Sequence, residues 1–329
     1  MKILILTDHK THSSTNSFYL IANSLYQHKG INEVHVATRS NSSNMTFFTG
    51  ESVVLYTKQL KHNINYDDFD KWINKGCEAR KTLHHFDYLL LRLPRPIHSH
   101  FFNFLGQCFN ERNIINRPSG IVTTGSKAFL LNLQDFTPPI KLLTNISEID
   151  SFRKRFPIVL KPLEEYGGRG IVKIENDMAY LGNDEKVSFL EYSKIYDQNP
   201  QQFLGMKFLK NVSNGDKRIV VANNEVLAAS LRLPAENSWL CNVAQGGSAT
   251  ISQISSDEKS MIEHLDPIMK NYGIFMYGLD TLENDNGIRI ISEINTLSVG
   301  GIAPYAEMSG RNLGSDYADL FIDFVKRKK

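Results

Sequence analysis

One stretch near the C-terminal end of the chain constrains its fold most strongly. Residues 288–294 are rich in isoleucine, a β-branched residue that is typical of buried strands. A second apolar run, residues 274–279, precedes them, and the intervening segment 283–287 reads Glu-Asn-Asp-Asn-Gly, which is a turn sequence. The pattern therefore predicts two neighbouring strands joined as a hairpin.

Three side chains with oxygen ligands fall on this hairpin. Asp280 ends the first apolar run, whereas Glu293 and Asn295 lie two residues apart on the second strand and so leave the same face. Carboxylate oxygens, together with the phosphates of a nucleotide, are the usual ligands of Mg²⁺. Asp280, Glu293 and Asn295 are therefore candidate ligands for Mg²⁺ or Mn²⁺. The alternative is a hairpin with solvated acids on its polar face.

Length, composition and net charge limit the number of packed units and the classes of partner that this chain can have. A chain of 329 residues can hold two or three packed units, and 41% hydrophobic with 22% charged residues is an ordinary soluble composition. The net charge of +2 gives no sign of a surface for nucleic acid or membrane, so we expect small-molecule partners and neither of those two.

Cysteine use and apolar run lengths indicate the compartment. Cys77, Cys108 and Cys241 are odd in number and widely spaced, which fits neither a disulfide framework nor a zinc pattern. The first apolar run, residues 3–6, is too short for a signal peptide, and no run approaches transmembrane length. We therefore expect a cytoplasmic protein.

Residues 1–122 read as an α/β unit. Polar residues 7–9 follow its first strand, at the end of the sheet where ligands bind in open α/β folds. Arg92 ends a later strand and precedes a proline-stiffened loop, which suits a carboxylate ligand, although a surface arginine is the alternative. Residues 40–80 yield no assignment. The expected elements are strands at 2–6, 33–37 and 88–91 and helices at 17–26 and 101–110.

Residues 123–205 read as a smaller α+β module with a phosphate-binding character. Lys127 lies at the start of a predicted helix, where it either reaches a phosphate or is solvated. A strand at 156–160 leads into Lys161 and a glycine-rich hairpin loop, whose backbone N–H groups and cations suit phosphate oxygens. The alternative is that these glycines only form the turn. The loop residues concerned are Gly167, Gly168, Arg169 and Gly170.

Residues 206–329 read as a second mixed module that contains the hairpin described above. Strands are expected at 219–222 and 225–233, joined by a turn at Asn223-Asn224, and helices at 258–272 and 316–325. The polar, glycine-containing loop 234–249 is of a kind that can move as a lid.

These motifs occur in an order that resembles the ATP-grasp ligases, most closely the bacterial-type glutathione synthetases. The resemblance covers roughly residues 85–305. Each motif alone is weak, but the ordered set is specific. The matching motifs are Asn116-x-Pro118, Lys127, Lys161-Pro162-Leu163-x-x-x-Gly167-Gly168, Gly215-Asp216-Lys217-Arg218, Arg232-x-Pro234, Asn242-x-Ala244-x-Gly246-Gly247, Gly278-Leu279-Asp280 and Glu293-Ile294-Asn295-x-x-Ser298.

The resemblance implies an α/β and α+β architecture, the ATP-grasp fold with an N-terminal α/β (pre-ATP-grasp) domain. That domain would span residues 1–122 and carry the acid substrate. The ATP-grasp domain would span 123–329, with a lid module at about 123–205 and a catalytic module at about 206–329. ATP would lie between these two modules, and the enzyme would be a homo-oligomer.

The resemblance also implies a reaction and a set of roles. An ATP-dependent ligase would phosphorylate a substrate carboxylate, and an amine would then displace the phosphate. ATP would contact Lys127, Lys161, Gly167, Gly168, Arg169, Gly170 and the segment Met206, Lys207, Phe208 and Leu209. Arg218 and Arg232 would be catalytic; Arg92, Asn242, Ser298, Gly300 and Gly301 would bind substrates; and Asp280, Glu293 and Asn295 would hold the metal.

Several positions depart from the family pattern on the substrate side. Leu240 replaces an arginine of the lid loop, Ser298-Val299-Gly300 replaces Ser-Pro-Thr, and the charged N-terminal loop is replaced by the histidine- and serine-rich segment 8–17. The resemblance makes a ligase that joins γ-glutamylcysteine to glycine the leading expectation, whereas these departures favour a different acid and amine. The alternatives are a ligase with another acid and amine, and a nucleotide-binding regulator without turnover.

Overall fold

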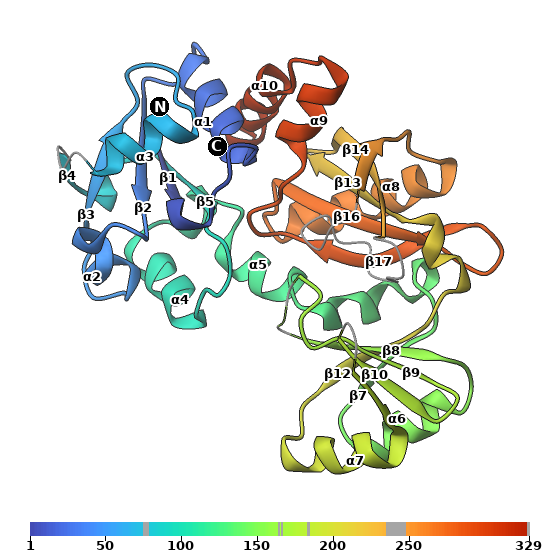
Figure 1. Ribbon diagram of the computed structural model, residues 1–329. Helices are drawn as coiled ribbons and strands as arrows, with labels where there is room; N and C mark the ends of the chain where they lie inside the picture. The colour runs from blue at the N-terminus through green and yellow to red at the C-terminus, as the bar shows by residue number, and fades with distance from the viewer. Residues whose placement is uncertain (75–78, 164, 166, 183–184, 235–247, 328–329) are drawn as a thin grey trace.

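The computed structural model describes residues 1–74, 79–163, 165, 167–182, 185–234 and 248–327. Its strands form three separate sheets, each built from one contiguous part of the chain (Figure 1). Among the described residues, no helix has the length and apolar character needed to cross a membrane.

The first sheet has the order β4-β3-β2-β1-β5-β6 and contains parallel pairs at its centre. The central strands are apolar on both faces because helices cover both, which is usual for parallel sheets. The strands are β1 (Lys2–Thr7), β2 (Glu33–Thr38), β3 (Val54–Gln59), β4 (Ala79–Thr82), β5 (Tyr88–Arg92) and β6 (Ile114–Ile115), and the helices are α1 (Ser17–Gln27), α2 (Met45–Phe48), α3 (Tyr66–Asn74), α4 (Ser99–Cys108) and α5 (Pro118–Thr124).

The second sheet has the order β11-β10-β9-β8-β12-β7, and helices α6 and α7 pack on it around a small apolar core of its own. Lys161 lies inside β8 rather than beyond its end, because this strand continues to Pro162. The elements are the 3₁₀ helix Lys127–Phe136, β7 (Ile140–Leu143), α6 (Ile146–Arg153), β8 (Ile158–Pro162), β9 (Val172–Glu175), β10 (Met178–Leu181), β11 (Glu185–Ser188), α7 (Phe189–Gln198) and β12 (Phe203–Lys207).

The third sheet is antiparallel throughout, with the order β15-β14-β13-β16-β17. The predicted hairpin is present as β16 and β17, with Asp280 paired to Glu293. The predicted Asn223-Asn224 turn is also present, and both residues adopt the positive φ angles that asparagine tolerates. The elements are β13 (Asp216–Ala222), β14 (Glu225–Leu233), β15 (Ser248–Ile251), α8 (Ser256–Asn271), β16 (Met276–Glu283), β17 (Arg289–Asn295), α9 (Ile302–Ser309) and α10 (Leu313–Lys326).

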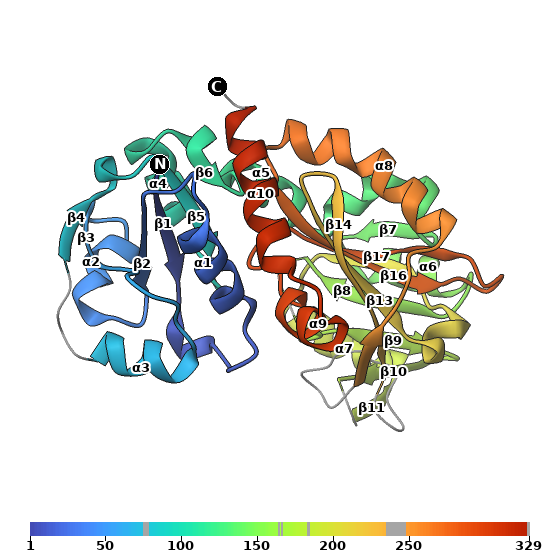
Figure 2. The same cartoon turned by 90° about the horizontal axis from the view of Figure 1, so that it is seen from above.

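Helix α10 joins the first and third sheets. It lies between α1 and the β13–β16 face in both views (Figures 1 and 2), and one apolar core includes Phe18 of α1, Val220 of β13 and Phe321 of α10. The end of the chain therefore returns to the N-terminal unit and fixes its position beside the third sheet.

The segment 206–209, an expected ATP contact, begins within a strand. Met206 and Lys207 are the last residues of β12 and pair with β8. The pairing is favourable because residues 203–206 are buried, so the strand contributes apolar side chains to the sheet.

Candidate functional site

A cluster of charged side chains lies on one face of the third sheet. The antiparallel register places Asp216 opposite Arg232, and it places Arg218 opposite Asp280. Glu293 and Asn295 follow on β17, where they pair with Asp280 and Gly278 respectively. The predicted carboxylate, amide and arginine residues are therefore brought together by strand pairing alone.

Two arginines hold the Asp280 carboxylate in place. Arg218 forms a two-pronged contact with it, from Nε to Oδ1 and from Nη2 to Oδ2, the latter at 2.6 Å. Arg232 Nη2 lies 3.1 Å from Asp280 Oδ2, and the same guanidinium makes two hydrogen bonds to Asp216, at 2.7 and 2.5 Å. Arg232 thus bridges two carboxylates.

Burial and these ion pairs act in opposite directions on the two acids. Burial alone would raise the pKa of Asp280, but Arg218 and Arg232 outweigh it and hold the pKa below its usual range. Burial is the dominant influence on Asp216 and raises its pKa, against the opposing effect of Arg232. Asp280 is therefore the anion that remains charged at the centre of the cluster.

The donor set of this cluster fits a hard divalent cation. Asn295 Nδ2 lies 3.5 Å from Asp280 Oδ2, and the strand register places Glu293 directly opposite Asp280 on the hairpin. Two carboxylates and an amide oxygen are the ligand types that Mg²⁺ and Mn²⁺ accept.

Two lysines from the second part of the chain approach the cluster. Lys161 Nζ donates to the carbonyl of Ser292 on β17 at 3.0 Å, and Lys127 Nζ donates to the carbonyl of Glu165. Burial lowers the pKa of both lysines, and the charge of Glu293 opposes that shift in each case. Among the described residues, Lys161 forms no ion pair, although it is half-buried. A half-buried cation in this position suits an anionic ligand such as phosphate.

The other candidate ATP contacts lie on the glycine-rich loop and at the end of β12. The three loop glycines adopt φ angles of +69°, +80° and +65°, which side chains with a Cβ rarely adopt, and Arg169 pairs with Glu165 at 3.3 Å. Lys207 forms an ion pair of 2.6 Å with Asp285 in the turn of the β16–β17 hairpin. Met206 and Leu209 are buried, and Phe208 packs its ring against the Lys173 ammonium. The glycines are Gly167, Gly168 and Gly170.

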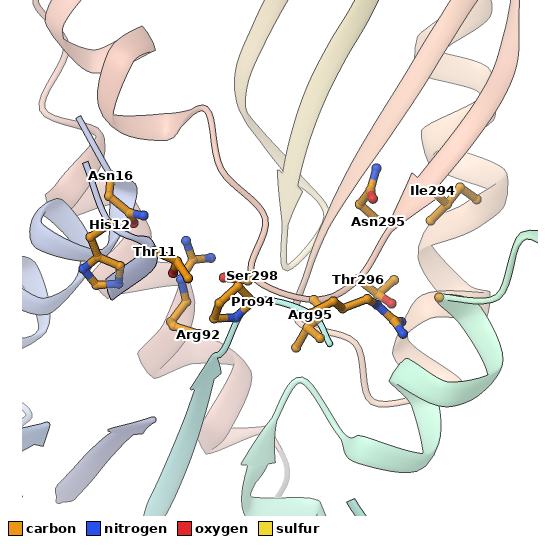
Figure 3. A pocket seen from close by; sticks show the side chains of 12 residues that line it. Thr11, His12, Asn16, Arg92, Pro94, Arg95, Ile294, Asn295, Thr296 and Ser298 are labelled. Atoms are coloured by element: carbon orange, nitrogen blue, oxygen red, sulfur yellow. The ribbon is translucent and has the colours of Figure 1, made fainter. Parts of the chain in front are cut away.

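A pocket of about 310 Å³ opens beside the charged cluster (Figure 3). It is bounded on one side by Asn295 and Ser298, on another by the loop after β5, and on a third by the loop after β1. Its lining residues are Thr11, His12, Asn16, Arg92, Pro94, Arg95, Gly125, Ile294, Asn295, Thr296, Leu297 and Ser298.

Arg92 reaches this pocket as a buried side chain, not as a surface one. Its Nη1 donates to the carbonyl of Val299 at 2.7 Å, whereas its buried Nε has no hydrogen-bond partner among the described residues. Ser298 and Gly301 have positive φ angles of +50° and +104°, which turn the chain sharply between β17 and α9. Gly300 lies between them, and the predicted ligand Asn242 lies outside the described residues.

Comparison with known proteins identifies the family to which this chain belongs. A family model described as "Prokaryotic glutathione synthetase, ATP-grasp domain" matches residues 126–310, more than half of the chain. The chain belongs to this family. It is an ATP-dependent ligase of the glutathione synthetase type, as its sequence motifs predicted.

Individual relatives and solved structures agree with this assignment. The glutathione synthetase of Bradyrhizobium diazoefficiens is 26% identical over 258 residues, covering 77% of this chain and 77% of that protein. The enzyme of the same name from Parasynechococcus marenigrum is 27% identical over 238 residues, covering 71% and 74%. Among solved structures, a D-cycloserine synthetase has a TM-score of 0.66 at 9% identity, covering 98% of this chain and 99% of that one. The D-alanine–D-alanine ligase of Bacillus anthracis complexed with ATP has a TM-score of 0.56 at 14% identity, covering 99% and 98%. These structural likenesses confirm the predicted ATP-grasp fold.

Sequence reasoning missed several pocket residues of this ATP-grasp ligase. Thr11, His12 and Asn16 line the pocket because the loop after β1 faces the end of β17, a contact between segments far apart in the sequence. Their position just beyond the first strand could have indicated a binding role, because α/β sheets bind ligands at that end. Arg95, in the proline-stiffened loop that follows Arg92, also lines the pocket.

Proposed function

We propose that this ligase joins γ-glutamylcysteine to glycine with consumption of ATP. The observation that carries the proposal is the adjacency of three features: the Lys161 ammonium at β17, a charged cluster that suits a divalent cation, and a pocket walled by Arg92. A nucleotide, a metal and a carboxylate substrate would then meet at Asn295, which belongs to both the cluster and the pocket.

Asp280, Glu293 and Asn295 are proposed to hold Mg²⁺ or Mn²⁺. The ion would neutralise charge on the transferring phosphoryl group. In the present arrangement, Arg218 and Arg232 satisfy the Asp280 oxygens, so these guanidinium groups would turn towards phosphate oxygens when metal and nucleotide bind. The arginines would in that way stabilise the charge that develops during transfer.

Nucleotide binding is assigned to the surroundings of the two lysines. Lys127 and Lys161 would contact phosphate oxygens, and the backbone N–H groups of Gly167, Gly168, Arg169 and Gly170 would approach the same phosphates. The segment 206–209 would contact adenine through its backbone, since the Met206 side chain is buried. ATP would thereby lie between the second and third sheets, as the division into lid and catalytic modules requires.

The proposed reaction has two steps. A carboxylate oxygen of the acid substrate attacks the γ-phosphorus of ATP, so that ADP leaves and an acyl phosphate forms. The amine nitrogen then attacks the acyl carbon, phosphate leaves with the bonding electron pair, and the amine loses a proton. Arg92, Ser298, Gly300 and Gly301 would hold substrate carboxylates, and the resemblance adds Asn242 to these residues. Positioning and charge stabilisation are thus the main tasks of the protein.

The compartment, the oligomeric state and the macromolecular partners are proposed from the sequence. We propose a cytoplasmic homo-oligomer without a nucleic-acid or membrane partner, consistent with the near-neutral net charge and the unpaired pattern of its cysteines.

A second substrate pair is a specific alternative. The pocket is lined by His12, Thr11 and Asn16, which come from the segment 8–17 that departs from the family pattern. A changed pocket wall with an unchanged metal cluster favours the same chemistry on a different acid or amine.

An assay of ATP consumption distinguishes these possibilities. Phosphate release is measured with Mg²⁺ for γ-glutamylcysteine plus glycine, for each substrate alone, and for a panel of other acids and amines. We expect release only when both named substrates are present. Release with a different pair would keep the mechanism and overturn the product. Tight ATP binding without release on any pair would instead indicate a regulator.

The pocket histidine leads to a prediction on pH dependence. Burial, followed by the charges of His9 and Arg92, lowers the pKa of His12 to about 4, against the opposing charge of Asp8. Because a lowered pKa keeps the ring neutral above pH 5, His12 should not titrate in the working range. We expect the ratio of kcat/KM between the wild type and His12→Asn to stay constant from about pH 5.5 to 8. A change in that ratio centred near pH 6.5 would contradict the shift.

A further inference from the structure

A second cluster of ligand-type side chains lies on the first sheet, away from the pocket. Glu33 begins β2, and His35 follows two residues later on the same face of the strand. His85 ends the 3₁₀ helix Leu83–His85. Because β1 and β2 are parallel and Glu33 pairs with Lys2, this cluster lies at the strand ends opposite to those that lead into the pocket. The ligand atoms of the three residues all lie within 4.8 Å of one another.

One oxygen of Glu33 faces both imidazole rings. Oε2 lies 3.1 Å from Nε2 of His35 and 3.0 Å from Nε2 of His85. The His35 side chain is 2% exposed, while those of Glu33 and His85 are 25% and 24% exposed. The cluster is therefore anchored in the sheet on one side and open to solvent on the other.

Thr57 positions the His35 ring. The Nδ1 atom of His35 lies 2.9 Å from the Thr57 hydroxyl oxygen, which in turn lies 3.4 Å from the carbonyl of Ala79. With Nδ1 held at Thr57, the other ring nitrogen, Nε2, faces the Glu33 oxygen that His85 also faces. Two imidazole nitrogens and one carboxylate group therefore come together at one place.

The nearby cations leave the shared oxygen accessible. Lys2 Nζ lies 3.2 Å from Oε1 of Glu33, the other carboxylate oxygen, so it does not compete for the position between the rings. Lys81 acts on His35 only through its charge. Lys2 also balances part of the negative charge of Glu33, and the Thr57 contact orients His35 in the way that outer-shell partners orient metal-bound histidines.

We propose that Glu33, His35 and His85 bind a divalent transition-metal ion of the Zn²⁺ class at a structural site. Two imidazole nitrogens and one carboxylate oxygen are a donor set typical of Zn²⁺, with water completing the tetrahedron. Tetrahedral bonds of about 2.1 Å separate ligand atoms by about 3.4 Å, so the observed 3.0 and 3.1 Å need only a small outward movement. The ion would connect the 3₁₀ helix to β2 and so stabilise the N-terminal unit.

Metal titration of the full-length chain tests this site. Chelator-treated protein, saturated with Mg²⁺ and ADP to occupy the nucleotide site, is titrated with Zn²⁺ by calorimetry. Even loss of an outer-shell partner weakens metal binding 10- to 100-fold, so His85→Asn should weaken Zn²⁺ binding by about 100-fold or more. The matched control is His84→Asn, which removes an exposed neighbouring histidine and should bind Zn²⁺ as the wild type does.

Two further readouts make the result decisive. Zn²⁺ should raise the melting temperature of the wild type and of His84→Asn, but not that of His85→Asn. Co²⁺ should give visible absorption bands of a four-coordinate ion in the first two proteins only. Equal affinity of His85→Asn and the wild type, or no Zn²⁺ binding by the wild type, would overturn the proposal. If His85→Asn does not fold, Glu33→Gln is judged by the same criteria.

Discussion

Replacing Glu293 with glutamine should lower the rate of ATP turnover by about 10²- to 10³-fold and leave the free energy of unfolding nearly unchanged. Glu293 lies opposite Asp280 in the hairpin register, and its charge acts on both lysines, Lys127 and Lys161. Among the described residues, it forms no hydrogen bond or ion pair through its side chain. Glutamine keeps the volume but removes the charge, so the change should weaken the metal and phosphate site rather than the sheet.

The measurement is the initial rate of ADP formation as a function of Mg²⁺ concentration, with urea unfolding in parallel. We expect a lower maximal rate and a higher Mg²⁺ requirement. Glu283→Gln is the matched control, because it makes the same chemical change on β16 of the same hairpin, where Glu283 contacts Arg289 and Asn214. The control should retain its rate. An unchanged Mg²⁺ dependence in Glu293→Gln would remove Glu293 from the metal site.

The part of this site that could be predicted from sequence is the part made by local pairing. Asp280, Glu293 and Asn295 lie on one hairpin, whose turn and strand periods are both local signals. The positions of Arg218 and Arg232 follow from the β13–β14 hairpin, whose Asn-Asn turn was equally readable. In a hairpin, the length of the turn sets the register in which the two strands pair. That register decides which side chains lie opposite each other.

The parts that could not be predicted depend on contacts between distant segments. His12 reaches the pocket only because the N-terminal unit lies beside the end of β17, and His35 meets His85 only because β2 and the 3₁₀ helix after β4 are neighbours. Residues 40–80 gave no assignment for a similar reason. Within them, the buried Asn44 side chain holds the backbone of Tyr56, a contact that no sequence periodicity indicates.

Asn116 shows how a short motif can carry a structural task rather than a chemical one. It belongs to the Asn116-x-Pro118 motif, and the structure places its buried side chain against the third sheet. Its Nδ2 donates to the carbonyls of Met276 and Thr296, both at 2.7 Å, and its Oδ1 accepts from the backbone N–H groups of Phe275 and Met276 at 2.8 and 3.0 Å. One side chain therefore connects the end of the first sheet to the hairpin that carries Asp280 and Glu293.

Replacing Asn116 with alanine should therefore destabilise the protein by about 3–5 kcal/mol, because four buried backbone groups lose their partner together. Asn116→Asp should not rescue stability, since its second oxygen would face two carbonyls without a proton to donate. The measurement is the shift in the urea unfolding midpoint. Asn113→Ala, three residues earlier, is the control and should change stability by about 0.5 kcal/mol or less. A loss no larger than that of the control would mean that the hairpin is held by its own sheet and by α10, without this bridge.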